Sequence, residues 1–333
     1  MLALWALYFA GGAVSALAFA QSNPTSVNDD SHFDISNAQM FLQKTDGLLR
    51  FFVQGGGFSI PALGASYFEA DNTTNDAFGV IPVAYATLAP ADNFSVMVGK
   101  LPTVIGAEYT FTFQNMNIQR GLLWNQENAV NRGVQANCST GPIAASLSLN
   151  DGIYSEDFNW VSGLVSWTID PNNVLTFAGG GSFDESTKST FVTPLVQNNS
   201  SIYNIMYTHT AGDWTLAPYL QLSTVDADAS LGIVDDAQTL GAAFLAKYQY
   251  SDTLSLAGRA EYIDSNGNTN LLYGTDSNAW SLTVTPTYQE GIFFARAEWS
   301  YVGAGDTSTG SAFGTTGNDD NQGRILLETG FLF

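Results

Sequence analysis

Apolar and polar residues alternate through most of this chain. Between residues 280 and 288 every even position is apolar and every odd position carries a hydroxyl group. The segments 214–223 and 254–262 alternate in a similar way. A period of two places successive side chains on opposite faces of a β-strand, and no helix has this pattern. The sequence therefore predicts strands with one apolar and one polar face.

The charged residues of these segments lie on the polar side. Arg296 and Glu298, for example, alternate with the apolar residues of 293–301. If the strands cross a membrane, an Arg or Lys that faced lipid near the midplane would cost about 2–4 kcal/mol, so an inward position is favoured. We expect these wall residues to face a common interior: Arg50, Lys247, Arg259, Glu261, Arg296, Glu298, Arg324 and Glu328.

Short and long connections alternate between the predicted strands. Tight turns, rich in the Gly, Pro, Asn and Asp that hairpins need, lie at 44–47, 89–93, 139–142, 170–173, 211–213, 251–252 and 289–291. Longer connections lie near 59–77, 101–131, 184–200, 225–237, 264–278 and 303–321, with a short exception near 153–158. This alternation is typical of outer-membrane barrels, which have short periplasmic turns and long external loops.

The number of strands follows from their length. About fifteen strands of roughly ten residues fit between Phe33 and Phe333, and bacterial single-chain barrels have an even number of strands. We expect a further strand at Gly11–Gln21, which would pair with the last strand and remove the open edge. The predicted fold is all-β: a transmembrane, antiparallel, up-and-down β-barrel of 16 strands over residues 11–333, with 14 strands as the alternative.

The start of the chain has two interpretations. The apolar run 1–21 ends in Ala18-Phe19-Ala20, which resembles a signal-peptide cleavage site. No Lys or Arg precedes Lys44, however, so the basic region of a secretory signal is missing. We therefore prefer a strand at 11–21 to a removed signal, and we expect 1–10 to be a signal-like or truncated N-terminal remnant.

The composition narrows the class of protein further. The chain has 31 acidic and 10 basic residues, a net charge of −21, which argues against nucleic acid as a partner. Its 22 Phe, 14 Tyr and 7 Trp residues argue against disorder. Charged residues make up 12%, against about 25% in ordinary globular proteins. A barrel that is apolar outside and polar inside requires this mixture of apolar and uncharged polar residues.

Enzymatic chemistry has little support in the sequence. The two histidines, His32 and His209, have no evident catalytic partner. The acidic pairs of the long connections, such as Asp319-Asp320, lie in no twelve-residue calcium loop and are expected to be solvated. We therefore expect no enzyme activity, no metal and no cofactor.

One block of sequence resembles a known family. The segment 98–108, which includes Gly99-Lys100 and Gly106-Ala107-Glu108, is followed by Asn115, by 120–123 (Arg-Gly-Leu-Leu) and by 131–134 (Asn-Arg-Gly-Val). This block, and more weakly the segments 9–24, 33–39 and 42–44, resembles the beta-barrel porin-2 (OmpL-like) family. The resemblance implies a channel of the outer membrane, and homotrimers are an expectation at the level of the family.

The last ten residues are similar to the closing strand of Gram-negative outer-membrane proteins. Such strands end in an aromatic residue that the barrel-assembly machinery recognises, and Phe331 and Phe333 occupy the matching positions. The resemblance therefore implies insertion by that machinery into the Gram-negative outer membrane, among its lipid and lipopolysaccharide.

The connection 101–131 is the longest, and a sixteen-stranded barrel is wide enough for an aqueous channel. It is the third external loop, which folds inward and forms the constriction in the porins that the chain resembles. We expect this role for Glu108, Arg120, Trp124, Glu127 and Arg132. The alternative is a loop that only caps the outside.

The sequence thus predicts a porin through which small hydrophilic solutes or ions diffuse passively. The acidic external loops, which include Asp226, Asp228, Asp235 and Asp236, favour cations because they raise the local cation concentration. Two alternatives remain open. One is a plugged barrel that acts as an adhesin or a structural anchor, and the other is a substrate-specific channel.

Overall fold

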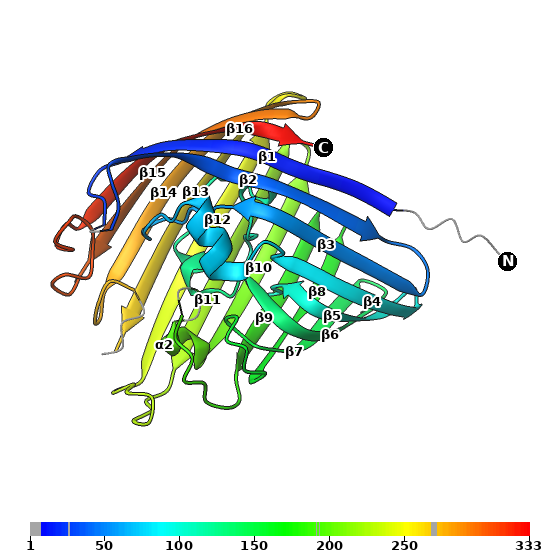
Figure 1. Cartoon of the computed structure of the whole chain (residues 1–333), viewed down its shortest axis with the longest axis horizontal. Helices are drawn as coiled ribbons and strands as arrows, with labels where there is room; N and C mark the ends of the chain where they lie inside the picture. Colours follow the sequence, from blue (N-terminus) through cyan, green and yellow to red (C-terminus); the bar gives the residue numbers. More distant parts are fainter. Residues whose placement is uncertain (1–7, 26, 191, 193, 268–271) are drawn as a thin grey trace.

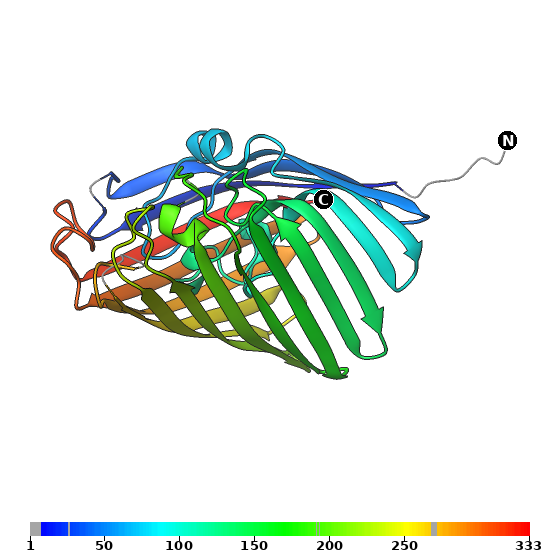
Figure 2. The same cartoon turned by 90° about the horizontal axis from the view of Figure 1, so that it is seen from below.

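The computed structural model describes residues 8–333 apart from 26, 191, 193 and 268–271. In this part of the chain, sixteen strands form one closed antiparallel barrel, in which each strand pairs with its neighbours in sequence and the first pairs with the last (Figures 1 and 2). The predicted fold class is therefore confirmed, with 16 strands and not 14.

The strand bounds agree closely with the alternation in the sequence. The strands are β1 (Tyr8–Gln21), β2 (Ser31–Lys44), β3 (Leu49–Phe58), β4 (Val83–Ala91), β5 (Phe94–Pro102), β6 (Val130–Thr140), β7 (Ile143–Asn150), β8 (Trp160–Asp170), β9 (Asn173–Ser182), β10 (Ser200–Ala211), β11 (Trp214–Val225), β12 (Ala237–Gln249), β13 (Leu254–Asn266), β14 (Asn278–Glu290), β15 (Phe293–Gly305) and β16 (Asn321–Leu332). The first strand begins at Tyr8, three residues before the predicted start at Gly11. Residues 1–7 lie outside the described residues, so the interpretation of the N-terminal remnant stays a prediction.

The long connections gather at one end of the barrel, as Figure 1 shows. We call it the external end, and the end with the tight turns the periplasmic end, after the usual arrangement of such barrels. The external connections are 22–30, 59–82, 103–129, 151–159, 183–199, 226–236, 267–277 and 306–320. In the described residues, no helix is long and apolar enough to cross a membrane.

The two faces of the wall differ sharply in exposure. In β16, Ile325 and Leu327 are 59% and 58% exposed, whereas Arg324 and Glu328 are 3% and 1% exposed. The apolar face is thus the outer surface, where the hydrocarbon of a membrane would cover it, and the polar face lines the interior. Phe331 belongs to the outer surface, where its ring lies 5.8 Å from that of Phe293.

A bulge between β1 and β2 turns two neighbouring polar residues inward. Ser15 pairs with Asn37 and Ala16 pairs with Ile35, so Ser36 is an extra residue in β2. Both Ser36 and Asn37 are fully buried. The bulge therefore adds a hydroxyl and an amide to the same patch of the inner wall.

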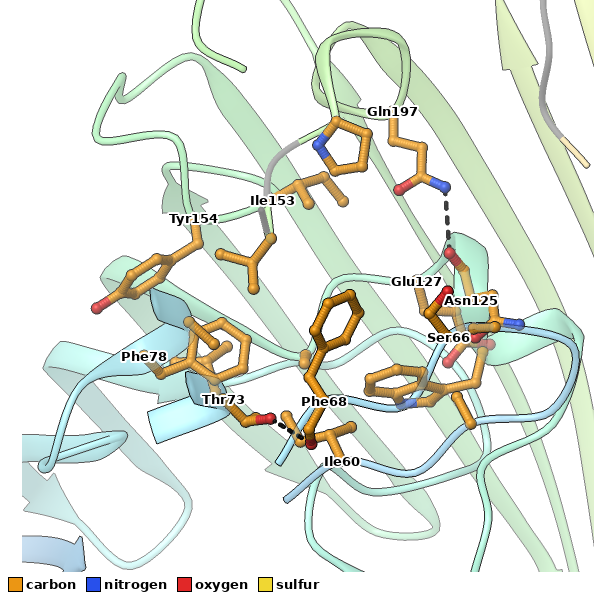
Figure 3. A pocket seen from close by; sticks show the side chains of 18 residues that line it. Ile60, Ser66, Phe68, Thr73, Phe78, Asn125, Glu127, Ile153, Tyr154 and Gln197 are labelled. Carbon is orange, nitrogen blue, oxygen red and sulfur yellow. Dashed lines mark hydrogen bonds between the residues drawn. The ribbon is translucent and has the colours of Figure 1, made fainter. Parts of the chain in front are cut away.

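The wall has a notch at the external end of β4. Pairing between β3 and β4 ends at Gln54 and Val83, but β3 continues beside β2 as far as Phe58. The helical turns α1 (Ala70–Thr73) and η1 (Thr74–Phe78) cover this notch. We call residues 68–80 the covering segment. Within it, Thr73 Oγ1 donates a hydrogen bond to the carbonyl of Phe68 at 2.9 Å (Figure 3).

The covering segment replaces the missing strand partner of β3. The amide of Gly56 donates to the carbonyl of Val80 at 2.8 Å. The amide of Phe58 donates to Thr74 Oγ1 at 3.0 Å. The backbone at the notch is therefore satisfied by side-chain and loop groups instead of a ladder.

Candidate functional site

The connection 103–129, here called the inner loop, lies inside the barrel. Its helical structure consists of two short 3-10 turns, η2 (Thr112–Gln114) and η3 (Leu123–Gln126). Ile105 packs with Trp160 of β8, and Phe111 meets Phe58 of β3 at 5.3 Å between ring centroids. The inner loop therefore touches widely separated parts of the wall.

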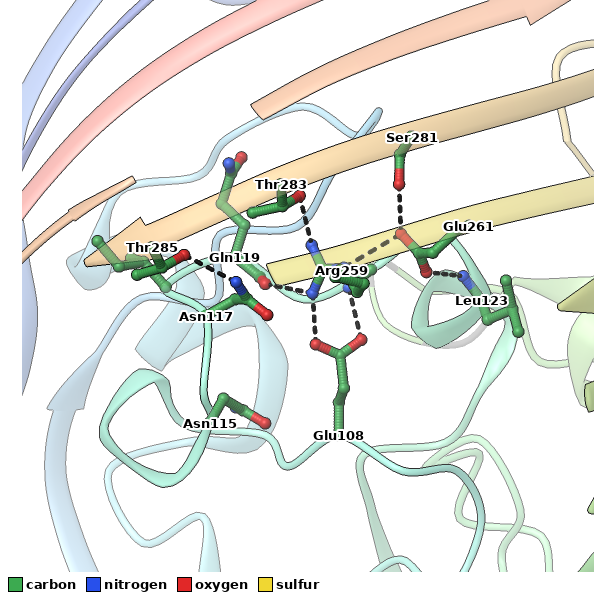
Figure 4. Close-up of polar contacts among 12 residues, drawn as sticks. Glu108, Asn115, Asn117, Gln119, Leu123, Arg259, Glu261, Ser281, Thr283 and Thr285 are labelled. Atoms are coloured by element: carbon green, nitrogen blue, oxygen red, sulfur yellow. Dashed lines mark hydrogen bonds and ion pairs between the residues drawn. The ribbon is translucent and has the colours of Figure 1, made fainter. Parts of the chain in front are cut away.

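A chain of ion pairs joins the inner loop to β13. Arg259 Nη1 lies 2.5 Å from Glu108 Oε1, and Arg259 Nε lies 3.2 Å from Glu261 Oε2. Ser281 Oγ donates to Glu261 at 2.6 Å, and Arg259 Nη1 also donates to the carbonyl of Gln119 at 2.8 Å. Figure 4 shows these groups meeting between the loop and the wall. One wall arginine thus shares its single positive charge between a loop carboxylate and a wall carboxylate.

Carboxylates of the wall accept hydrogen bonds from amides of the inner loop. Glu298 accepts from the amides of Ile118 and Gln119, the latter at 3.1 Å, and from Gln119 Nε2 at 2.9 Å. Glu261 accepts from the amide of Leu123 at 3.3 Å. These bonds are charge-assisted and therefore stronger than bonds between neutral groups.

Arginines of the wall donate in turn to carbonyls of the inward-folded backbone. Arg296 Nη1 and Nη2 each donate at 3.1 Å, to the carbonyls of Asn115 and Thr112. Arg324 Nη1 and Nη2 donate to the carbonyls of Ala62 and Ala65 at 2.7 and 2.6 Å. The wall therefore supplies acceptors for the amides and donors for the carbonyls of an irregular backbone.

The bulge between β1 and β2 takes part in this anchoring. Asn37 Nδ2 donates to Thr112 Oγ1 at 2.6 Å, and Thr112 Oγ1 donates to Glu328 Oε1 at 2.7 Å. Glu328 also pairs with Arg296, whose Nε lies 3.0 Å from Oε2. The junction where the barrel closes is thus tied to the inner loop.

A second segment folds inward beside the inner loop. Ala62 forms a parallel bridge with Arg120, and the amides of Leu63 and Arg120 donate to the carbonyls of Arg120 and Pro61 at 2.9 and 3.0 Å. Asn125 Nδ2 donates to the carbonyl of Leu63 at 2.7 Å. The sequence did not lead us to expect this inward course for residues 61–65.

Two glycines allow the loop to pass close to its charged neighbours. Gly106 has a φ of +81°, which favours glycine, and a side chain there would collide with the Glu127 carboxylate. A side chain at Gly121 would collide with the Glu261 carboxylate. The φ of Gly106 therefore favours glycine, and Gly121 lets the loop backbone pass close to the Glu261 carboxylate.

Two charged side chains of the inner loop are buried without a partner among the described residues. Arg120 is 0% exposed and Glu127 is 6% exposed, and no polar atom of either side chain has a hydrogen-bond partner there. Burial lowers the pKa of Arg120 to about 10. Burial, with the nearby charges of Glu108 and Glu261, raises the pKa of Glu127 well above its ordinary range. Both charges are energetically costly where they lie.

Not every predicted site residue belongs to the loop. Arg132 lies in β6, where its ion pairs run at 2.8 Å to Asp151 and 2.9 Å to Glu156. These pairs tie it to the connection 151–159. The inner loop ends at 129, and not at 131 as predicted, so Arg132 lies outside it. Trp124 does lie in the loop, 5.8 Å from the guanidinium carbon of Arg120.

The wall residues predicted to face the interior fall into two groups. Six of them anchor the inward-folded segments: Arg259, Glu261, Arg296, Glu298, Arg324 and Glu328. Arg50 and Lys247 are half-buried near the periplasmic turns, and Arg50 Nε donates to the carbonyl of Gly47 at 3.0 Å. Neither residue is hydrogen-bonded to the inner loop in the described part of the chain.

The sequence analysis missed the uncharged anchors of the loop. Asn117 Nδ2 donates to Thr285 Oγ1 at 2.7 Å, and Gln119 Nε2 donates to Ser300 Oγ at 2.7 Å. A signal was present, because Asn115, Asn117 and Gln119 alternate with Met116 and Ile118. This period of two indicates an extended segment with one polar face.

The closed barrel and its inward-folded third external loop place the chain in the class of porin-like outer-membrane barrels. The anion-selective porin from Comamonas acidovorans is 13% identical, with 98% of this chain and 100% of that chain covered and a TM-score of 0.67. In-vitro folded OmpT of Vibrio cholerae, an outer-membrane protein in its trimer form, is 12% identical, with 98% and 99% covered and a TM-score of 0.67. OmpF of Salmonella typhi in complex with daunomycin is 14% identical, with 98% of each chain covered and a TM-score of 0.63.

The family assignment is more specific than these likenesses of fold. The model of the family described as "Putative beta-barrel porin-2, OmpL-like" matches residues 10–333. The chain therefore belongs to that family, as the block around 98–134 indicated, and it is a porin-type barrel of the bacterial outer membrane. No curated protein matches the chain.

Removing Arg259 should destabilise the barrel strongly. The substitution Arg259→Met leaves the carboxylates of Glu108 and Glu261 buried without their shared arginine, and we expect a loss of about 3–5 kcal/mol in the free energy of unfolding. Glu108→Gln in the same chain should recover part of this loss. Urea unfolding in lipid vesicles measures each value. Lys44→Met, which breaks the more exposed pair with Asp46, is the control and should cost less than about 1 kcal/mol. Equal losses for Arg259→Met and Lys44→Met would show that the buried ion pairs contribute no more to the free energy of unfolding than an exposed pair does.

The stability of the protein should depend on pH through Glu127. A carboxyl group with a raised pKa binds its proton more tightly in the folded state, so it lowers stability as pH rises above the unfolded value of about 4.3. Glu127→Gln should therefore stabilise the protein by at least about 1 kcal/mol more at pH 8 than at pH 4. Urea unfolding at both pH values tests this, with the exposed Glu69→Gln as control. An effect of Glu127→Gln that is the same at both values would contradict it.

Proposed function

We propose that this protein is a porin through which small hydrophilic solutes or ions diffuse passively across the Gram-negative outer membrane. The observation that carries the proposal is the inner loop, which Arg259, Arg296 and Glu298 of the wall hold across the interior. A loop fixed in this way narrows the barrel to the space beside it. Arg120 is buried without a hydrogen-bond partner among the described residues, so it would act on permeating ions through its electric field and not by contact.

The charge at the external end supports a preference for cations. Of the ten Lys and Arg residues, Arg120 and Lys188 are the two that fall in the external connections. Exposed acidic residues are abundant there: Glu69, Asp71, Asp76, Asp184, Glu185, Asp226, Asp235, Asp236, Asp306, Asp319 and Asp320. Such a mouth concentrates cations and repels anions at low ionic strength.

The contacts of the histidines support a channel without turnover chemistry. His209 Nδ1 lies 2.7 Å from Asn173 Oδ1, beside a periplasmic turn. His32 is stacked against Phe19, with ring centroids 4.7 Å apart. Both positions suit packing better than acid–base catalysis, which needs a nucleophile or a carboxylate in line with the ring.

A second candidate is a barrel that the inner loop closes. The loop contacts strands around the whole interior, from Ile105 at β8 and β10 to Gln119 at β15. These contacts with many strands favour a plugged barrel that serves as an adhesin or anchor, or a narrow channel specific for one substrate. Conductance separates these possibilities.

The proposed surroundings of the barrel follow from its outer face. The apolar belt is suited to outer-membrane lipid, and we infer that lipopolysaccharide surrounds the external end. We infer that the barrel-assembly machinery inserts the chain through its aromatic terminus at Phe331 and Phe333. The trimer form of one structural relative supports a homotrimer.

Shortening the inner loop should widen the channel. With residues 109–126 replaced by a short Gly-Ser linker, we expect single-channel conductance in planar bilayers to rise several-fold. Heat-modifiable mobility checks that the barrel has folded. A wild-type protein that is silent while the shortened form conducts would establish the closed barrel, and equal conductance of the two would show that the loop does not narrow the pore.

A cross-link provides the matched control for this experiment. Gln119 and Ser300 share a hydrogen bond across the interface of loop and wall, so a cysteine pair at these positions, in a Cys138→Ser background, would hold the loop in place. If the observed position is the conducting one, the oxidised protein conducts like the wild type. A conductance that falls on oxidation and recovers on reduction would show instead that the loop has to move.

Neutralising the mouth should reduce the preference for cations. We expect the combined change of Asp235, Asp236, Asp319 and Asp320 to Asn to shift the reversal potential in a 0.1 M salt gradient towards zero, and to have little effect near 1 M salt, where the Debye length is about 3 Å. Asp92→Asn with Asp213→Asn and Asp252→Asn at the periplasmic turns is the control. An unchanged or anion-selective reversal potential would show that the interior arginines, and not the acidic mouth, determine the selectivity.

A further inference from the structure

An apolar cavity lies at the external end between the inward-folded segments and the connection 151–159. It has a volume of about 230 Å³ and is lined by Ile60, Phe68, Phe78, Trp124, Val130 and Ile153, among others. Figure 3 shows Ile60, Phe68, Phe78 and Ile153 arranged around this space. Its apolar lining differs from the polar and charged contacts that fill the rest of the interior.

The chemistry of the lining defines the molecule that would fit. Apolar cavities stay dry and take up apolar molecules, and one of 150 Å³ is large enough for benzene. The rings of Phe78 and Tyr154 meet edge to face at 5.1 Å, and such rings favour aromatic partners. The Trp124 side chain lines the same cavity, but its indole Nε1 is fully buried, so the ring and not its N–H is what the cavity presents.

Charge around the cavity argues against an anion. Glu127 is one of the lining residues, and the external loops above are acidic. The side chains of Ser66, Thr73, Asn125 and Gln197 are the other polar groups in the lining. All four side chains are already engaged: Ser66 with the Thr25 hydroxyl at 2.8 Å, and Thr73, Asn125 and Gln197 as donors to backbone carbonyls.

The cavity adjoins the notch in the wall. Thr73, Ala77 and Phe78, which line it, belong to the helical turns that cover the unpaired end of β3. The amide of Phe58 bonds there to the Thr74 hydroxyl instead of to β4. A molecule in this cavity would therefore contact both the inner loop, through Trp124, and the segment that completes the wall.

We propose that this cavity is a binding site for a small uncharged aromatic molecule, packed on Phe68, Phe78 and Trp124. The proposal is independent of the proposed porin function, because it rests on the apolar lining of this cavity and not on permeation. Occupancy of the cavity does not depend on conductance, so a failure of the channel proposal leaves the test of binding intact.

Calorimetric titration of the protein in lipid nanodiscs tests the site, with 1-naphthol as the probe and empty nanodiscs as the blank. Nanodiscs replace detergent because a detergent chain could occupy the same cavity. We expect saturable binding with a stoichiometry of one. Ala77→Phe, which puts a ring into the cavity, should weaken binding at least tenfold. Ala86→Phe, which adds the same ring on the exposed outer face of β4, should leave binding unchanged.

A second variant keeps the test decisive if Ala77→Phe does not fold. Ala129→Leu, which narrows the same cavity from a different lining residue, should weaken 1-naphthol binding by about 3- to 10-fold. The absence of saturable binding to heat-modifiable wild-type barrel would overturn the proposal. So would equal binding to wild type and to a folded Ala77→Phe, or tighter binding of cationic 1-naphthylmethylamine than of 1-naphthol.

Discussion

The rest of this structure depends on one constraint, which is that an irregular backbone inside a barrel must find hydrogen-bond partners there. The inner loop has little regular structure, so only some of its amides and carbonyls bond to one another, mainly in its two 3-10 turns. Arg259 and Arg296 donate to its carbonyls, and Glu298 accepts from its amides. Non-helical backbone at membrane depth is tolerated only when it is buried in protein or lines a water-filled space. The charged wall meets the first condition, and it fixes where any aqueous path can run.

Charge is distributed differently in the interior and at the external end. In the interior, acidic and basic side chains are nearly equal in number and mostly bound to one another or to backbone, so their fields largely cancel. The external connections are strongly acidic and exposed, so their field acts on solutes before they enter. Ionic strength screens exposed charges far more than buried ones. The mouth and the interior would therefore respond differently to salt.

The wall is least regular where the second external connection meets it. β4 stops short of its neighbours, and Thr74 and Val80 supply the hydrogen bonds that a longer strand would have made. The same connection sends residues 61–65 inward to pair with Arg120. One segment thus completes the wall, supports the inner loop and bounds an apolar cavity. A change in any of these three contacts would be felt by the other two, because packed segments shift together.

The sequence by itself determined the barrel, because a period of two in side-chain polarity is a local property that survives without tertiary information. It also placed the turns, and it put Arg259, Glu298 and Arg324 on the inner face. Only the tertiary structure decided the partners of these residues. Sequence gives no sign that Arg324 serves Ala62 and Ala65, since those partners are backbone carbonyls, which every residue carries. Arg132 was assigned to the loop because it is near it in sequence, but the fold pairs it with Asp151. The notch and its cavity arise where four connections meet, which are 59–82, 103–129, 151–159 and 183–199, so no single segment could predict them.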